Sequence, residues 1–253
     1  MSASPFDLTG RTAVVTGASR GIGLGMAEAL AAAGADIVAV ASSPLPEGSA
    51  VERAVVAHGR RFVGRHADFA DLDAVAALGD DLAGLRVDIL VNNAGTIERA
   101  PAIEHPLESW KRVIDVDLTS HFVITQKLVA PMLERRDGRV IFTASLLSFQ
   151  GGITVPGYAA AKSGIAGLTR ALSNEWIGQG VTVNAIAPGY IATDNTQALQ
   201  DDPDRSRSIL ERIPAGRWGR AEDLGGATVF LASTAAAYVS GIVLPVDGGW
   251  LAR

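Results

Sequence analysis

The chain has 253 residues, of which 48% are apolar and 19% charged, with a formal net charge of −5 and no cysteine. This length and apolar content suit one α/β domain, and an acidic chain lacks the basic surface that nucleic acids or anionic membranes attract. Disulfide chemistry is excluded, and the four histidines are too scattered for a metal cluster. Because no apolar run reaches the roughly 20 residues that cross a bilayer and no signal peptide is recognisable, a cytoplasmic protein is expected.

Seven short apolar runs have the composition of buried strands, and segments with helical periodicity separate them. Because βαβ crossovers bury strands on both faces, this order predicts a single Rossmann-like, doubly wound α/β domain over residues 1–253, with a seven-stranded parallel sheet. The expected strands are Thr12–Thr16, Asp36–Ala41, Arg61–Ala67, Ile89–Asn92, Arg139–Ala144, Thr182–Ala187 and Ile242–Val246.

Helical periodicity is clearest in Gly21–Ala33 and in Gly164–Ile177. The stretch 193–214 interrupts the alternation of strands and helices with a run of aspartates and a proline. It predicts a helical insertion over the carboxyl ends of the strands, which we interpret as a substrate lid.

A glycine-rich turn, Thr16–Gly23, follows the first expected strand directly. Its glycines let the backbone turn tightly and approach a pyrophosphate, while the N–H groups of the next helix face that anion. Such a turn alone is a weak signal, since tight turns need glycine without any ligand.

Three further motifs strengthen the prediction of a nucleotide site. Asn92–Gly95 ends the fourth strand, Ser145 follows the fifth, and Tyr158 and Lys162 lie four residues apart at the start of a helix. Residues four apart share one helix face, so an ammonium group lies beside a phenol and favours its ionised form, as acid–base catalysis requires. An isolated tyrosine–lysine pair of this kind is usually solvated. Here the pair follows the glycine-rich turn, Asn92–Gly95 and Ser145 in the expected order along the chain, which favours catalysis.

Together these motifs resemble the classical short-chain dehydrogenase/reductase family, from Thr12 to the end of the chain. The resemblance implies hydride transfer at a nicotinamide, with Tyr158 moving the alcohol proton, Ser145 holding the substrate oxygen and Lys162 also holding the nicotinamide ribose. The cofactor-binding residues that it implies are Gly17, Ser19, Arg20, Ile22, Gly23, Ser42, Asp68, Phe69, Asn93, Ala94, Gly95, Tyr158, Lys162, Ile191 and Thr193. For Phe69 and Ile191, ordinary core packing is the favoured alternative.

One position departs from the family pattern. Asp117 stands where the family usually has an asparagine that helps a water relay protons toward the lysine. A carboxylate cannot donate as an amide does, and near Lys162 it would stabilise the ammonium form. Asp117 is therefore either part of a modified catalytic relay or a carboxylate that pairs with a neighbouring donor.

Cofactor choice depends on the residues after the second strand. NAD-specific members have an acidic residue there, whereas this chain has Ser42 and Ser43. Arg20 and the Ser42 hydroxyl are predicted to bind a 2′-phosphate, which favours NADP(H). NAD(H) stays open, because Arg20 is alternatively an exposed cation that touches nothing.

The loop 145–152, with residues 195–197, 213–219 and 247–253, resembles the sugar-acid branch of the family. This implies a sugar acid of the gluconate or 2-keto-3-deoxygluconate type as substrate. Arg99 is expected to bind its carboxylate, with Arg217 second, although packing is the favoured role of Arg217. Gln150 either bonds a sugar hydroxyl or is solvated.

Two other functions remain open. Reduction of 3-oxoacyl-(acyl carrier protein) would need basic residues beside the pocket, which 193–214 does not supply. A non-catalytic cofactor-binding sensor, with turnover disabled at Asp117, is opposed by the intact Ser145, Tyr158 and Lys162. The resemblance also implies a homotetramer, with Trp250 either at an interface or packed within its own chain.

Overall fold

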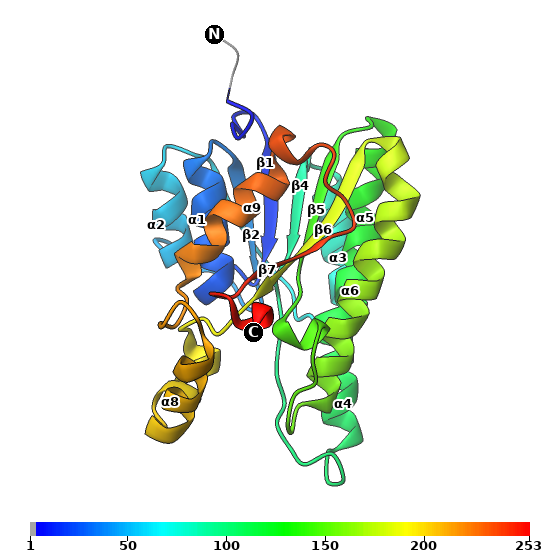
Figure 1. The fold of residues 1–253 in the computed structure, drawn as a ribbon. Coiled ribbons are helices and arrows are strands. Elements are labelled where there is room, and N and C mark those ends of the chain that lie inside the picture. The colour runs from blue at the N-terminus through cyan, green and yellow to red at the C-terminus, as the bar shows by residue number, and fades with distance from the viewer. Residues whose placement is uncertain (1–3) are drawn as a thin grey trace.

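The computed structural model describes residues 4–253, which form one domain around a seven-stranded sheet (Figure 1). The strand order is β3-β2-β1-β4-β5-β6-β7 and every neighbouring pair is parallel, which confirms the predicted doubly wound architecture. The strands are β1 Thr12–Thr16, β2 Asp36–Ala41, β3 Phe62–His66, β4 Ile89–Asn92, β5 Gly138–Thr143, β6 Val181–Pro188 and β7 Val243–Val246.

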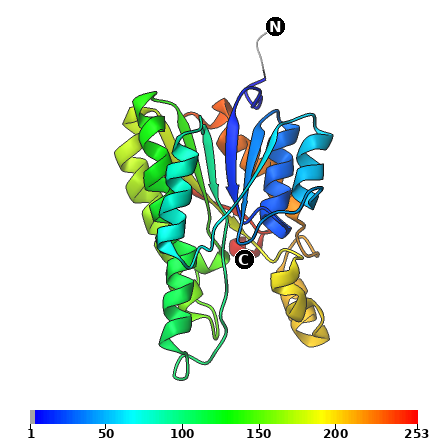
Figure 2. The same cartoon turned by 180° about the vertical axis from the view of Figure 1, so that it is seen from behind.

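Helices cover both faces of the sheet (Figures 1 and 2). One face carries α1, α2 and α9, and the other carries α3, α5 and α6. The helices are α1 Gly21–Ala32, α2 Ala50–Ala57, α3 Leu72–Ala83, α4 Leu107–Ile114, α5 Ser120–Glu134, α6 Pro156–Trp176, α7 Gln197–Gln200, α8 Pro203–Arg212 and α9 Gly225–Ala232.

The helix expected over Gly164–Ile177 begins earlier, at Pro156. Proline suits the first turn of a helix, where its missing N–H has no intrahelical partner. The motif of Tyr158 and Lys162, expected at the start of a helix, therefore lies in the first two turns of this same helix. In the segment 193–214, the structure has the short helices α7 and α8.

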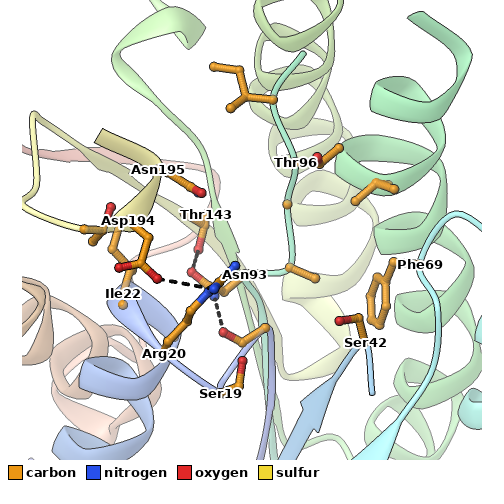
Figure 3. A pocket seen from close by; sticks show the side chains of 18 of the residues that line it. Ser19, Arg20, Ile22, Ser42, Phe69, Asn93, Thr96, Thr143, Asp194 and Asn195 are labelled. Carbon is orange, nitrogen blue, oxygen red and sulfur yellow. Dashed lines mark hydrogen bonds and ion pairs between the residues drawn. The ribbon is translucent and has the colours of Figure 1, made fainter. Parts of the chain in front are cut away.

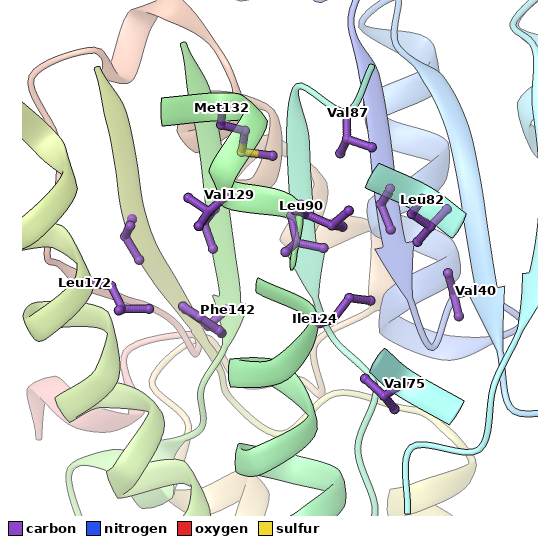
Figure 4. Close-up of a cluster of buried hydrophobic side chains, with 14 of the residues drawn as sticks. Val40, Val75, Leu82, Val87, Leu90, Ile124, Val129, Met132, Phe142 and Leu172 are labelled. Carbon is purple, nitrogen blue, oxygen red and sulfur yellow. The ribbon is translucent and has the colours of Figure 1, made fainter. Parts of the chain in front are cut away.

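The core consists of two layers, one on each face of the sheet. In the layer shown in Figure 4, Phe142 and Leu90 of the sheet pack against Ile124 of α5 and Leu82 of α3, and all four side chains are buried. β1, β2 and β4–β6 are buried nearly throughout because a parallel sheet is covered on both sides.

Sheet order fixes where a ligand can bind. The chain runs outward from β1 through β2 to β3, and then returns to place β4 on the other side of β1. A crevice forms at such a reversal, outside the carboxyl ends of the strands. α4 and α8 extend past this end of the sheet from opposite sides (Figure 1).

Candidate active site

A cavity of about 500 Å³ opens at the carboxyl ends of β1 and β4 (Figure 3). It extends from the glycine-rich turn to the start of α6 and brings together most of the residues that the sequence singled out. Those that line it are Gly17, Ser19, Arg20, Ile22, Gly23, Ser42, Asp68, Phe69, Asn93, Ala94, Gly95, Arg99, Tyr158, Lys162 and Thr193.

The glycine-rich turn packs directly against the segment that follows β4. Gly17 has φ +66°, and a Cβ there would lie 2.9 Å from the Cα of Ala94. A Cβ on Gly23 would overlap the carbonyl oxygen of Gly17. The Asn93 amide donates to the carbonyl oxygens of Thr16 and Gly17, at 3.0 and 3.3 Å. Glycine is required here because two backbones meet without space for side chains.

The start of α1 is suited to an anion. No side chain caps its first turn, no acidic residue lies in that turn, and the adjacent glycines line the cavity. Uncapped N–H groups and the helix dipole both favour a negative ligand. These residues fit the pyrophosphate of a dinucleotide. Ser42 lies further along the cavity wall, and no carboxylate directly follows β2. Arg20 forms an ion pair with Asp194 at 3.3 Å, and both side chains are about three-quarters exposed.

Tyr158 and Lys162 lie on consecutive turns of α6, with the Lys162 Nζ 5.5 Å from the centre of the phenol ring. Lys162 is 2% exposed and donates to the Thr143 carbonyl oxygen at 2.9 Å, so the end of β5 fixes the ammonium group. Tyr158 is half-buried and lines the cavity. The arrangement places a fixed positive charge behind a phenol that faces the ligand space.

Asp117 lies behind Lys162 and is fully buried. Its Oδ1 accepts from the Thr96 N–H at 2.7 Å, whereas its Oδ2 is 3.8 Å from the Lys162 Nζ and has no hydrogen-bond partner. Burial raises the pKa of Asp117 to about 6, against the opposing effects of the Lys162 charge and the Thr96 N–H.

A histidine that sequence reasoning missed lies one helical turn beyond Asp117. His121 is fully buried, and its Nε2 is 2.8 Å from the Ala94 carbonyl oxygen. Burial, and then the Lys162 charge, lower the pKa of His121 to about 3, so the imidazole is neutral. One turn further, Thr125 accepts from the Asn92 amide at 2.9 Å. The four-residue spacing from Asp117 was the available signal, but a histidine among apolar residues resembled core.

The structure does not bring every proposed residue into the cavity. Ile191 is 4% exposed and packs into the core. Gln150 accepts from the Trp250 Nε1 at 3.4 Å. Arg217 forms a two-bond ion pair with Asp223, at 2.6 and 2.9 Å, outside this cavity. Ile191 therefore lies where core packing, the alternative weighed for it, would place it, whereas Arg217 is exposed and held by an ion pair rather than packed.

Ser145 follows β5 and is not among the residues that line the cavity; it caps a short turn, with its Oγ accepting from the Leu147 N–H at 3.1 Å. Among the residues described, its hydroxyl has no assigned acceptor. The cavity wall also contains residues that the sequence did not indicate. They are Ala41, Thr96, Ile97, Arg112, Val116 and Thr143, whereas Gly21 of the glycine-rich turn and residues 194–196 of the predicted lid also line the cavity.

Known proteins resemble this sequence over nearly its whole length. A family model described as enoyl-(acyl carrier protein) reductase matches residues 17–251. The 2-dehydro-3-deoxy-D-gluconate 5-dehydrogenase of Pseudoalteromonas atlantica is 58% identical, over 98% of each chain. The chain belongs to the short-chain dehydrogenase/reductase family.

Solved members of the short-chain dehydrogenase/reductase family share the fold closely. A structure described as a 2-deoxy-D-gluconate 3-dehydrogenase from Agrobacterium tumefaciens, with bound NADP, is 50% identical with a TM-score of 0.94, and the match covers 99% of this chain and 100% of that one. One described as an NAD(P)-dependent gluconate 5-dehydrogenase from Beutenbergia cavernae is 49% identical, with the same TM-score and coverage. This family member is accordingly an oxidoreductase.

Two features are absent from residues 4–253. No helix in this part of the chain is long and apolar enough to span a membrane. Within the same residues, no group of three or more histidine, aspartate or glutamate side chains is arranged to hold a metal ion.

Proposed function

We propose that the protein transfers a hydride between NADP(H) and a hydroxyl or keto group of a sugar acid of the gluconate or 2-keto-3-deoxygluconate type. The observation that carries this proposal is the single cavity that joins an anion-binding helix start to Tyr158 with Lys162 behind it. The names of the relatives supply the substrate class.

The residues have separate roles in this mechanism. When bound, the nicotinamide accepts or supplies the hydride. Tyr158 takes the alcohol proton during oxidation and returns it during reduction, while Ser145 donates its hydroxyl hydrogen to the substrate oxygen. Lys162, fixed by Thr143, stabilises the phenolate and holds the nicotinamide ribose. Asp117 acts as a positioning residue that holds the ammonium group.

We further propose that the glycine-rich turn holds the pyrophosphate and that Arg20 and Ser42 bind the 2′-phosphate of NADP. Asp68 and Phe69 flank the adenine, Asn93 binds the adenosine ribose, and Thr193 and Ile191 meet the carboxamide, in the case of Ile191 through its backbone since the side chain is buried. NADP in a related structure supports this choice. The segment 193–214 closes over the substrate as a lid, which is supported by its contribution of residues 193–196 to the cavity wall.

The test is turnover measured at 340 nm by wild type and Tyr158→Phe, with each nicotinamide, against aldonic acids, keto-deoxy sugar acids and a 3-oxoacyl thioester. We expect wild-type turnover of a sugar acid and a loss of at least about 100-fold in kcat for Tyr158→Phe, because phenylalanine has no proton to transfer. NADPH binding by the variant controls for folding. Retained turnover would contradict the role of Tyr158, and preference for the thioester would favour 3-oxoacyl reduction.

A further inference from the structure

Two arginines with no acidic partner share the cavity wall with Tyr158. Arg99 and Arg112 both line the cavity, and neither lies within 4 Å of a carboxylate in residues 4–253. The other two cations in the wall are paired, Arg20 with Asp194 and Lys162 with Asp117. Positive charge without a counter-ion is therefore concentrated on these two side chains.

Helix packing places α4, which carries Arg112, against the helix that carries the proposed proton carrier. A Cβ on Gly157, the residue before Tyr158, would lie 3.5 Å from Val113 and 3.6 Å from Trp110, so α4 packs against the first turn of α6 in van der Waals contact. Val113 is buried at this contact, whereas its neighbour Arg112 is exposed and lines the cavity together with Val116, one helical turn later. The same wall thus carries the Arg112 cation and the Tyr158 phenol.

A backbone hydrogen bond brings the segment of Arg99 to the end of the cavity where Tyr158 and Arg112 lie. The N–H of the next residue, Ala100, donates to the Thr154 carbonyl oxygen at 3.0 Å, in the loop that leads into α6. Arg20 lies at the other end, beside the glycine-rich turn. The two unpaired guanidinium groups therefore belong to the part of the cavity left for substrate and not to the part that suits the nucleotide phosphates.

We propose that Arg112 is a specificity-determining residue that binds the substrate carboxylate together with Arg99. This inference rests on the proposed function, because it assigns the anionic end of the sugar acid. A guanidinium group donates two parallel hydrogen bonds to a carboxylate, and two such groups from different segments fix its orientation as well as its charge. A neutral polyol has no charge with which Arg112 could form an ion pair.

The experiment compares Arg112→Gln, Arg112→Lys and Lys111→Gln with wild type. Lys111 is the matched control, since it is adjacent on α4 but pairs with Glu108 and does not line the cavity. Steady-state constants are measured for the sugar acid that wild type oxidises fastest. The corresponding neutral polyol, with CH₂OH in place of the carboxylate, is measured as substrate or as competitive inhibitor, and NADPH binding checks folding.

For Arg112→Gln we expect the KM of the acid to rise about tenfold or more, with kcat within about twofold and polyol binding unchanged. Arg112→Lys should recover part of the loss, and Lys111→Gln should behave as wild type. An unchanged KM in Arg112→Gln, with wild type active on acids, overturns the assignment of Arg112 alone. No wild-type turnover of any acid overturns the proposed function, and this inference with it.

Discussion

At position 117 an aspartate replaces the family's usual asparagine, so a carboxyl oxygen stands where an amide nitrogen would be. An asparagine at this position would offer an amide, whereas the carboxyl group leaves an unpartnered buried oxygen 3.8 Å from the Lys162 ammonium. Burial favours the neutral acid and Lys162 favours the carboxylate, and burial is the larger effect because the pKa is raised to about 6. The charge next to Lys162 therefore changes within the range in which enzymes are assayed.

We expect Asp117→Asn to remove the pH dependence that ionisation of Asp117 gives to stability and to kcat/KM. Since the folded-state pKa of about 6 exceeds the unfolded value of 3.8, the folded protein binds the proton more tightly. The stability of wild type relative to the variant is thus greatest below about pH 4 and falls, by about 3 kcal/mol in all, as pH rises through about 6. In kcat/KM, wild type should gain activity as pH rises through about 6, and the variant should lack this step.

Urea unfolding and initial rates between pH 4.5 and 8 measure both effects. Asp115→Asn, two residues earlier on the same π-helical turn and without an ion pair in the described chain, is the matched control. Parallel pH profiles for wild type and Asp117→Asn would show that ionisation of this carboxyl group affects neither stability nor turnover.

At the scale of elements, two segments far apart in the chain meet across the cavity. Arg20 at the start of α1 pairs with Asp194, which lies in the short turn before α7 and α8 (Figure 3). Exposed pairs of this kind contribute little to stability. The guanidinium group is consequently available to a phosphate that carries more charge than Asp194.

Arg20→Ala should therefore lower kcat/KM for NADPH by about tenfold or more, while the value for NADH changes by less than about twofold, because only the former cofactor has a 2′-phosphate. Steady-state rates with both cofactors, under the same conditions, measure the ratio. An unchanged preference would exclude Arg20 from phosphate binding.

Local patterns and tertiary packing account for what the sequence could and could not predict. The strands and the Tyr158–Lys162 pair were predictable because their signals lie within a few consecutive residues. Arg112 was not, since an arginine on an exposed helix resembles any solvated cation until α4 packs on Gly157. Gln150 likewise depended on Trp250, 100 residues later in the chain.

For the molecule as a whole, we propose assembly into a homotetramer. Exposed apolar side chains on α4 and α5 support it, with Leu107, Trp110 and Phe122 exposed by 63%, 37% and 41%. Light scattering at micromolar concentration should give about four times the chain mass of 26.2 kDa. A mass of 26.2 kDa would reject the assembly. Trp250 would not contribute to it, since this side chain is 4% exposed within its own chain.

Trp250 packs with Leu146, beside Ser145, and with Ile209 of α8, and the Arg212 guanidinium lies 3.9 Å from its ring centre. An indole responds to a change in nearby charge with a change in its emission. Any displacement of α8 relative to Trp250 would move Arg212 from the ring. The protein therefore contains an intrinsic fluorophore for following that displacement in real time, without an attached label.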